Sequence, residues 1–207
     1  MKYKEIRDRS LQLLNQYSIA GSTIESSYNN QQDYLTRIPA LVNDAMVYIA
    51  TTAKRILATY DIVLADMFEN HGMYEIPLPS DCYQISPRGF IRFIDGDIER
   101  CAPYRRVGSN LYLPLDSEGD YALEYYRYPQ RLEDNPDDDD ELDNRVDAQY
   151  AIPYYVAAHL ALHDDPGARD VLMSEFETRL SRLCEEQYVE QVGVMDVYGG
   201  WGSGVDY

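Results

Sequence analysis

The sequence has few cysteines, few histidines and no long hydrophobic run. Three cysteines, Cys82, Cys101 and Cys184, lie far apart among 207 residues. They predict neither a disulfide framework nor a short-spaced metal site. No apolar stretch approaches the roughly 20 residues that a helix needs to span a bilayer. The first residues are amphipathic rather than those of a signal peptide, so we expect a protein made in the cytoplasm.

Positive charge is also scarce. Eighteen Lys and Arg residues stand against 36 Asp and Glu, which gives a formal net charge of −18. Such a surface repels phosphates and disfavours direct binding of DNA or RNA, but it does not exclude a protein that handles DNA without adhering to it. Tyrosine is abundant, with 20 residues against four phenylalanines. Tyrosine is common at protein–protein contacts, although strand propensity alone also accounts for it.

Apolar residues recur every three or four positions in the segment 33–60, which predicts an amphipathic helix capped by Asp33 and bent or begun at Pro39. Similar patterns predict helices over 3–17, over 147–163 with Asp147 as its cap, and over 165–188 with Asp165 as its cap. The apolar stripes are complementary, so we expect one core to join the two ends of the chain. Its predicted members are Ile38, Val42, Ile49, Ile56, Val156, Leu160, Phe176 and Leu180.

Between Ile62 and Tyr128 the apolar period changes to two, which predicts short strands. The dipeptide Asp95-Gly96 predicts a tight hairpin, and Ser117-Glu118-Gly119 supports a second one. Several prolines lie in or beside these strands, so the sheet should have many edges. The predicted strands are Met73–Leu78, Gly89–Ile94, Asp97–Cys101, Leu111–Leu115 and Tyr121–Tyr128.

These patterns together predict an α+β fold, in which an antiparallel bundle of about four helices carries an inserted small antiparallel sheet and an extended C-terminal arm. The predicted parts are N-terminal helices over 1–60, a β-rich module over 61–131, an acidic linker over 132–146, a helical hairpin over 147–190 and the arm over 191–207.

The arm is rich in glycine and has no core of its own, yet it holds the single tryptophan. Such a segment gains from a tryptophan when it anchors in a partner. We therefore predict partner-binding residues in the arm, namely Val192, Val194, Tyr198, Trp201 and Tyr207.

The acidic stretch 132–147 contains nine acids and one arginine. It lacks the glycine and the alternating ligands of a calcium-binding loop, so a solvated or partner-neutralised loop is the favoured interpretation. If DNA passes the protein, these acids are candidates to face its channel: Asp137, Asp138, Asp139, Asp140 and Glu141.

The sequence carries no catalytic signature. His159 and His163 share one helix face, but they supply at most half of a zinc site. No serine sits in a nucleophile turn, and the glycine-rich segment 199–204 neither follows a strand nor opens a helix. The sequence therefore predicts no catalytic residue, no bound metal and no cofactor, and it favours a binding or assembly protein over an enzyme.

Four segments resemble the head–tail connector (adaptor) proteins of tailed bacteriophages. Asp33–Asn43 is similar to their N-terminal helix motif, and Tyr74–Asp81 to a strand and turn of the larger members. Tyr121–Pro129 is similar to a later strand. Ala151–Leu160, followed by Asp164-Asp165-Pro166, resembles their closing helical hairpin. The resemblance spans about residues 33–188, and its motifs are structural rather than catalytic.

The resemblance implies a homo-oligomeric ring, usually of twelve copies, that docks beneath the portal protein in the neck of the virion. Such a ring continues the DNA channel without binding DNA specifically, and it offers a platform to tail or nozzle proteins. It is made in the host cytoplasm and has no membrane partner. Two alternatives stay open: another phage neck or tail-tube component, and a small bacterial metal-binding protein or metal-dependent enzyme that uses His159, His163 and the acidic run.

Overall fold

The computed structural model describes residues 1–14, 28–64, 67–94, 98–114, 120–162 and 165–193. The chain forms two compact units. The first, here the helical unit, combines Met1–Lys54 with Gln130–Tyr207, and the second, here the sheet unit, is Arg55–Pro129. The fold thus mixes helices with antiparallel sheets, as predicted, and the sheet unit is inserted between the two parts of the helical unit.

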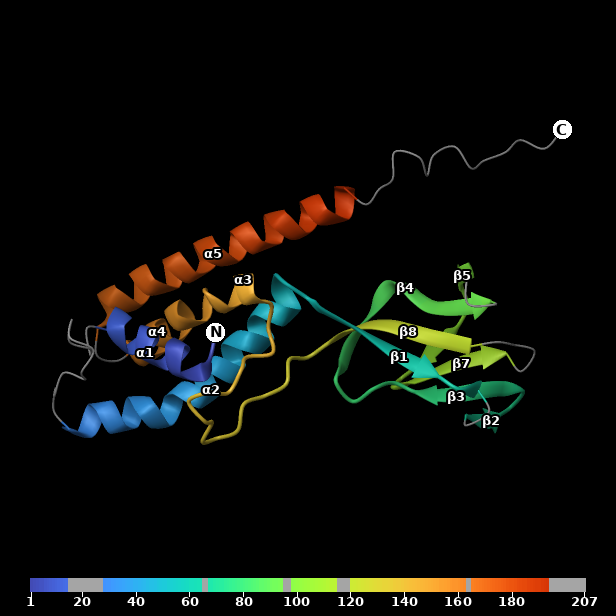
Figure 1. The fold of residues 1–207 in the computed structure, drawn as a ribbon, viewed down its shortest axis with the longest axis horizontal. Helices are drawn as coiled ribbons and strands as arrows, with labels where there is room; N and C mark the ends of the chain where they lie inside the picture. The colour runs from blue at the N-terminus through green and yellow to red at the C-terminus, as the bar shows by residue number, and fades with distance from the viewer. Residues whose placement is uncertain (15–27, 65–66, 95–97, 115–119, 163–164, 194–207) are drawn as a thin grey trace. The chain divides into compact units, whose positions relative to one another are not determined.

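The helical unit is organised around a short apolar helix. Helix α4 contacts α1, α2 and α5, and Figure 1 shows the long α5 beside it. The helices are α1 (Tyr3–Leu13), α2 (Tyr28–Thr52), α3 (Val146–Gln149), α4 (Ile152–Leu160) and α5 (Pro166–Gly193).

The core of this unit joins residues that lie about a hundred positions apart, as the apolar stripes predicted. Ile38, Val42 and Ile49 of α2 are fully buried in one cluster with Val156, Leu160 and Phe176 of α4 and α5. Leu180 packs at its margin, half-buried. Ile56 was wrongly placed in this core, because it begins a strand of the sheet unit.

The predicted helix over 33–60 was wrong at both ends. Helix α2 begins at Tyr28, so Asp33 is not its cap; its carboxylate instead lies 3.3 Å from the guanidinium of Arg37, one turn further on. Pro39 lies inside the helix rather than at its start. The helix ends at Thr52, and the sheet unit begins at Arg55, before the predicted boundary at residue 61.

The predicted helix over 147–163 is two helices, α3 and α4, with Pro153 in the first turn of the second. Asp147 does not cap α3, because that position belongs to Arg145 and Asp147 lies in the first turn. The cap predicted for α5 is confirmed. Oδ1 of Asp165 accepts a hydrogen bond of 3.0 Å from the backbone N–H of Ala168, which satisfies one of the free donors of the first turn.

The sheet unit contains two four-stranded antiparallel sheets, with strand orders β1-β8-β4-β5 and β2-β3-β7-β6. Their inner faces share one apolar core that includes Ile76, Leu113 and Leu123. The strands are β1 (Ile56–Ile62), β2 (Phe68–Asn70), β3 (Met73–Pro77), β4 (Cys82–Ile94), β5 (Ile98–Cys101), β6 (Arg105–Val107), β7 (Asn110–Pro114) and β8 (Asp120–Arg127).

All five predicted strands are present, and β1, β2, β6 and the first half of β4 were not predicted. Ile94 pairs with Ile98, so the two strands around Asp95-Gly96 form a hairpin, but three residues rather than the predicted two separate this pair. That turn and Ser117–Gly119 lie outside the described residues. Strand β4 changes register against β8 between Ile85 and Phe90. Gly89 lies in this irregularity at φ +58°, and a Cβ atom there would lie 2.7 Å from the ring of Tyr104, so a larger residue would be strained at this position.

Candidate functional site

The acidic run is an ordered part of the helical unit. Residues 132–145, here the acidic loop, lie alongside the start of α1. Main-chain hydrogen bonds join the two segments. The N–H of Tyr3 donates to the carbonyl of Asp140 at 2.8 Å, and that of Lys4 donates to the carbonyl of Asp138 at 3.2 Å. Lys2 and Glu141 form an isolated antiparallel bridge. The backbone beneath the acids is therefore fixed by pairing rather than left to solvent.

Three buried amide side chains fasten the loop from the other side. Asn43 of α2 accepts a 2.8 Å hydrogen bond from the N–H of Leu132 and donates a 3.0 Å bond to its carbonyl. Nε2 of Gln149 donates to the carbonyls of Leu142 and Asn144. Nδ2 of Asn144 in turn donates to the carbonyl of Met46. Buried amides that satisfy main-chain groups in this way fix one conformation of a segment.

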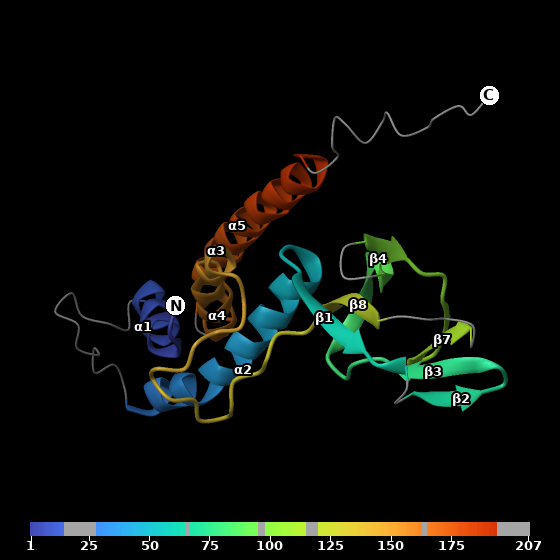
Figure 2. The same ribbon diagram turned by 45° about the vertical axis from the view of Figure 1, so that its right-hand side comes forward.

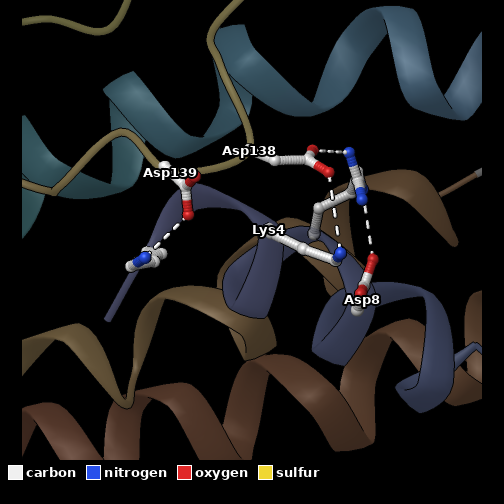
Figure 3. Close-up of polar contacts among 6 residues, drawn as sticks. Lys4, Asp8, Asp138 and Asp139 are labelled. Carbon is white, nitrogen blue, oxygen red and sulfur yellow. Dashed lines mark hydrogen bonds and ion pairs between the residues drawn. The ribbon is translucent and has the colours of Figure 1, made fainter.

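Part of the acidic run is neutralised by the chain itself. Nζ of Lys2 lies 2.7 Å from Oδ1 of Asp139, and Nζ of Lys4 lies 3.8 Å from Oδ2 of Asp138. The guanidinium of Arg7 donates to Asp138 and also reaches Asp8 at 3.1 Å (Figure 3). Lys2 at the N-cap of α1, and Lys4 and Arg7 within the helix, thus point toward Asp138 and Asp139.

The ion pairs shift the pKa values of their members. The hydrogen bond and charge of Lys2 lower the pKa of the Asp139 carboxyl, and the same hydrogen bond raises the pKa of the Lys2 ammonium. Both groups are exposed, so solvent and salt screen the pair and its effect on folding is small. These bases therefore contribute mainly by neutralising Asp138 and Asp139.

Five of the other acids of the loop line a hollow of about 480 Å³. Asp137 and Glu141 are exposed there, and the carboxylate of Asp140 accepts a hydrogen bond from the N–H of Asp137. Asp143 accepts a 2.6 Å bond from the N–H of Gln130. The hollow presents a concentration of negative charge. Its lining residues are Gln130, Arg131, Leu132, Glu133, Asn135, Asp137, Asp140, Glu141 and Asp143.

The predicted site residues are thus divided between two environments. Asp138 and Asp139 lie against α1, whereas Asp137, Asp140 and Glu141 lie at the hollow. Sequence reasoning missed the partners Lys2, Lys4 and Arg7. The signal was present, since three bases within six positions are a rare cluster in a chain with twice as many acids as bases.

Within the described residues, no group of three or more His, Cys, Asp or Glu side chains has a geometry that holds a metal ion. Nδ1 of His159 lies 2.9 Å from the carbonyl of Tyr155, and the two rings are 4.0 Å apart. His163 lies outside the described residues. His159 is thus occupied by contacts one turn back on its own helix.

The predicted arm lies almost wholly outside the described residues, which end at Gly193. Val194, Tyr198, Trp201 and Tyr207 belong to that part. Val192 was wrongly assigned to an extended arm, because α5 continues through Gly193.

Comparison of the chain with protein-family models and with curated proteins gave no match. In the described part of the chain, none of the helices combines the length and apolar content needed to cross a bilayer.

Proposed function

We propose that this chain is a structural protein of the phage virion, a head-to-tail adaptor whose copies form a ring under the portal. The observation that carries the proposal is the acidic loop. Its backbone is fixed at both ends, and five of its acidic side chains line one hollow. A fixed negative surface repels passing phosphates without binding them, which is the property that a DNA channel needs.

The division of the chain supports the same proposal. Under it, α1, α2, α4 and α5 act as an antiparallel bundle that forms the body of each copy, and the inserted sheet unit reaches other proteins. Tyrosines with exposed or half-exposed rings on the sheet unit, such as Tyr83, Tyr126 and Tyr128, suit protein contacts. The ring takes the family's usual twelve copies, offers a platform to tail or nozzle proteins, and acts without catalysis or a cofactor. The host cytoplasm makes it, and it resides in the neck.

The arm is the proposed attachment to the portal. Because α5 continues through Gly193, Val192 belongs to that helix, and the proposed anchors of the arm are Tyr198 and Trp201. Burial of a tryptophan removes about 150–250 Å² from water, but ordering a glycine-rich segment offsets much of the gain. One arm therefore binds weakly, and a ring of arms binds firmly.

The test uses the full chain and portal-bearing heads that lack tails, from the phage that encodes it. Electron microscopy should show a ring of added density at the portal vertex. A chain ending at Gly193 should keep the melting temperature of the full chain and lose docking, and Trp201→Ala should weaken docking without a change in melting temperature. If the truncated chain docks with unchanged affinity, the arm is not the attachment to the portal. A full chain that adds no density to the heads, or that binds duplex DNA tightly at physiological salt, would overturn the function itself.

Images of purified portals and of complete virions separate the neighbouring possibility. Density that joins only further down the tail, with none on purified portals, would make the chain another neck or tail-tube component.

A further inference from the structure

The second sheet of the sheet unit ends in two matching strands. Its order β2-β3-β7-β6 leaves β2 and β6 at the edges, and each is three residues long. Figure 2 shows β2 at the margin, beside β3. Within the described residues, each edge strand pairs on one side only. An unpaired edge is a template for another strand.

The turns determine which backbone groups point outward. Asn70 pairs with Met73 across His71-Gly72, whose φ angles are 49° and 78°, and Val107 pairs with Asn110 across Gly108-Ser109. In a hairpin with a two-residue loop, the residues next to the loop exchange hydrogen bonds with each other, and the following pair does not. On the edge strands, the residues of the next pair away from each loop are Glu69 and Arg106. Their backbone N–H and C=O groups therefore point away from the sheet.

The strand directions allow the sheets of successive copies to join edge to edge. All three pairings in this sheet are antiparallel, so β2 and β6 run in opposite directions. A second copy displaced along the sheet brings its β2 beside β6 of the first copy in antiparallel orientation. With Glu69 placed opposite Arg106, their outward N–H and C=O groups meet as one hydrogen-bonded pair.

The side chains match in the same register. Glu69 and Arg106 are exposed and of opposite charge, and both lie on the face that carries Tyr74 and Leu111. On the other face, Val107, 50% exposed, meets Phe68, 72% exposed. Arg105 then lies opposite Asn70. A slip of one residue would place these side chains on opposite faces and remove every match.

We propose that β6 of one copy pairs with β2 of the next copy of this chain, with Arg106 opposite Glu69. The occupant of each edge is thus a second copy, selected by charge, by apolar contact and by strand direction. The inference rests on the proposed ring and names one of its contacts. Because the two edges differ, the contact is head-to-tail, and such contacts close into rings or continue as filaments.

Disulfide trapping tests the register in the full chain, with the three native cysteines replaced by alanine. Asn70→Cys with Arg105→Cys, and separately Phe68→Cys with Val107→Cys, should give a ladder of covalent multimers under oxidising conditions. A bond within one copy is excluded, because β3 and β7 separate the edges by roughly 14 Å and a disulfide joins Cα atoms less than about 7 Å apart.

The matched control is Phe68→Cys with Arg105→Cys, which joins the same two edges out of register and should give no ladder. Equal ladders from the control and the matched pairs, or none from any pair when the copies assemble, would overturn the pairing.

Charge reversal gives a second measurement. Glu69→Arg alone and Arg106→Glu alone should each reduce assembly, seen as a shift to monomer by analytical ultracentrifugation. The double variant should restore it, and so should an equal mixture of the two single variants, because each edge then meets an opposite charge. If rings form on portals equally well in all variants, the proposed contact between β6 and β2 is wrong. The proposed adaptor function would be unaffected by that result. A wild-type chain that forms no ring on portals would overturn the adaptor function and the strand contact together.

Discussion

Nζ of Lys54 lies 3.7 Å from Oδ2 of Asp147, and the Lys54 side chain is only 3% exposed. Lys54 follows the end of α2, while Asp147 lies in the first turn of α3, so the pair joins the two parts of the helical unit. An ammonium that is removed from water needs opposite charge nearby, whereas an aliphatic chain in its place does not.

Removing one partner of this pair should therefore cost more than replacing the lysine. We expect Asp147→Asn to lower the free energy of unfolding by about 1–3 kcal/mol, since Asp147 is partly exposed, and Lys54→Met to change it by less than about 1 kcal/mol. Urea denaturation measures both. Asp170→Asn is the control, because its pair with Arg169 is exposed and should contribute almost nothing. Equal losses from Asp147→Asn and Lys54→Met would contradict the argument.

Leu160 should be among the costliest core positions of the helical unit. It is 1% exposed and packs in the cluster that α2, α4 and α5 share, so Leu160→Ala should lower the free energy of unfolding by about 2–5 kcal/mol. Leu162→Ala, two residues later at 40% exposure, makes the same chemical change at the surface and should cost well under half as much. Similar losses from the two variants would mean that Leu160 is not part of the core.

The sheet unit should weaken at alkaline pH through Tyr125. Burial, together with the 3.1 Å hydrogen bond to Oδ1 of Asp81, raises the pKa of Tyr125 to about 12. Because the folded pKa lies above the ordinary value of 10, this contribution is complete below pH 10 and is lost as the pH rises toward 12.

Tyr125→Phe removes that titration. At neutral pH it should cost about 0.5–1.5 kcal/mol for the lost hydrogen bond. Urea midpoints measured between pH 8 and pH 11 should show the gap between wild type and variant closing as the pH rises above 10. A constant gap across that range would assign the difference to packing alone.

The exposed carboxylates of Asp137 and Glu141 at the hollow should govern contact with DNA. Asp137→Lys combined with Glu141→Lys should raise affinity for duplex DNA in a gel-shift assay at low salt and slow genome ejection, with little effect on melting temperature. The control is Asp134→Lys, which changes charge on the same loop outside the hollow. If the double variant ejects its genome at the wild-type rate, the hollow does not face the DNA channel.

The helical core was predictable because its stripe repeats over several turns of α2, so Ile38, Val42 and Ile49 could be assigned to one face. The end of α2 was not predictable from that period. Ile56 continues the helical spacing and also starts an alternating strand, and only the pairing of β1 with β8 decides between them. Strands β2 and β6 have three residues each, which is too short for an alternating apolar pattern to be recognised in the sequence.

The candidate site was predictable in position but not in geometry. The run Asp137–Glu141 is evident from composition. Its division into acids paired with α1 and acids at a hollow depends on main-chain bonds from Tyr3 and Lys4, which join residues more than 130 positions apart. Neither local propensity nor charge counting determines such a pairing. The opposing edges at Glu69 and Arg106 were missed for the same reason, since their relation exists only once strand order is known.

The insertion of the sheet unit also sets an order of events during synthesis. The ribosome releases α2 early, but α4 and α5, which bury its apolar stripe, follow only after all of Arg55–Pro129 has been made. At about 5–20 residues per second, that delay is on the order of several seconds. The sheet unit can fold in this interval, while Ile38, Val42 and Ile49 remain exposed on the nascent chain. Chaperones that recognise apolar helices should therefore bind the unfinished chain at this segment and leave when α5 emerges.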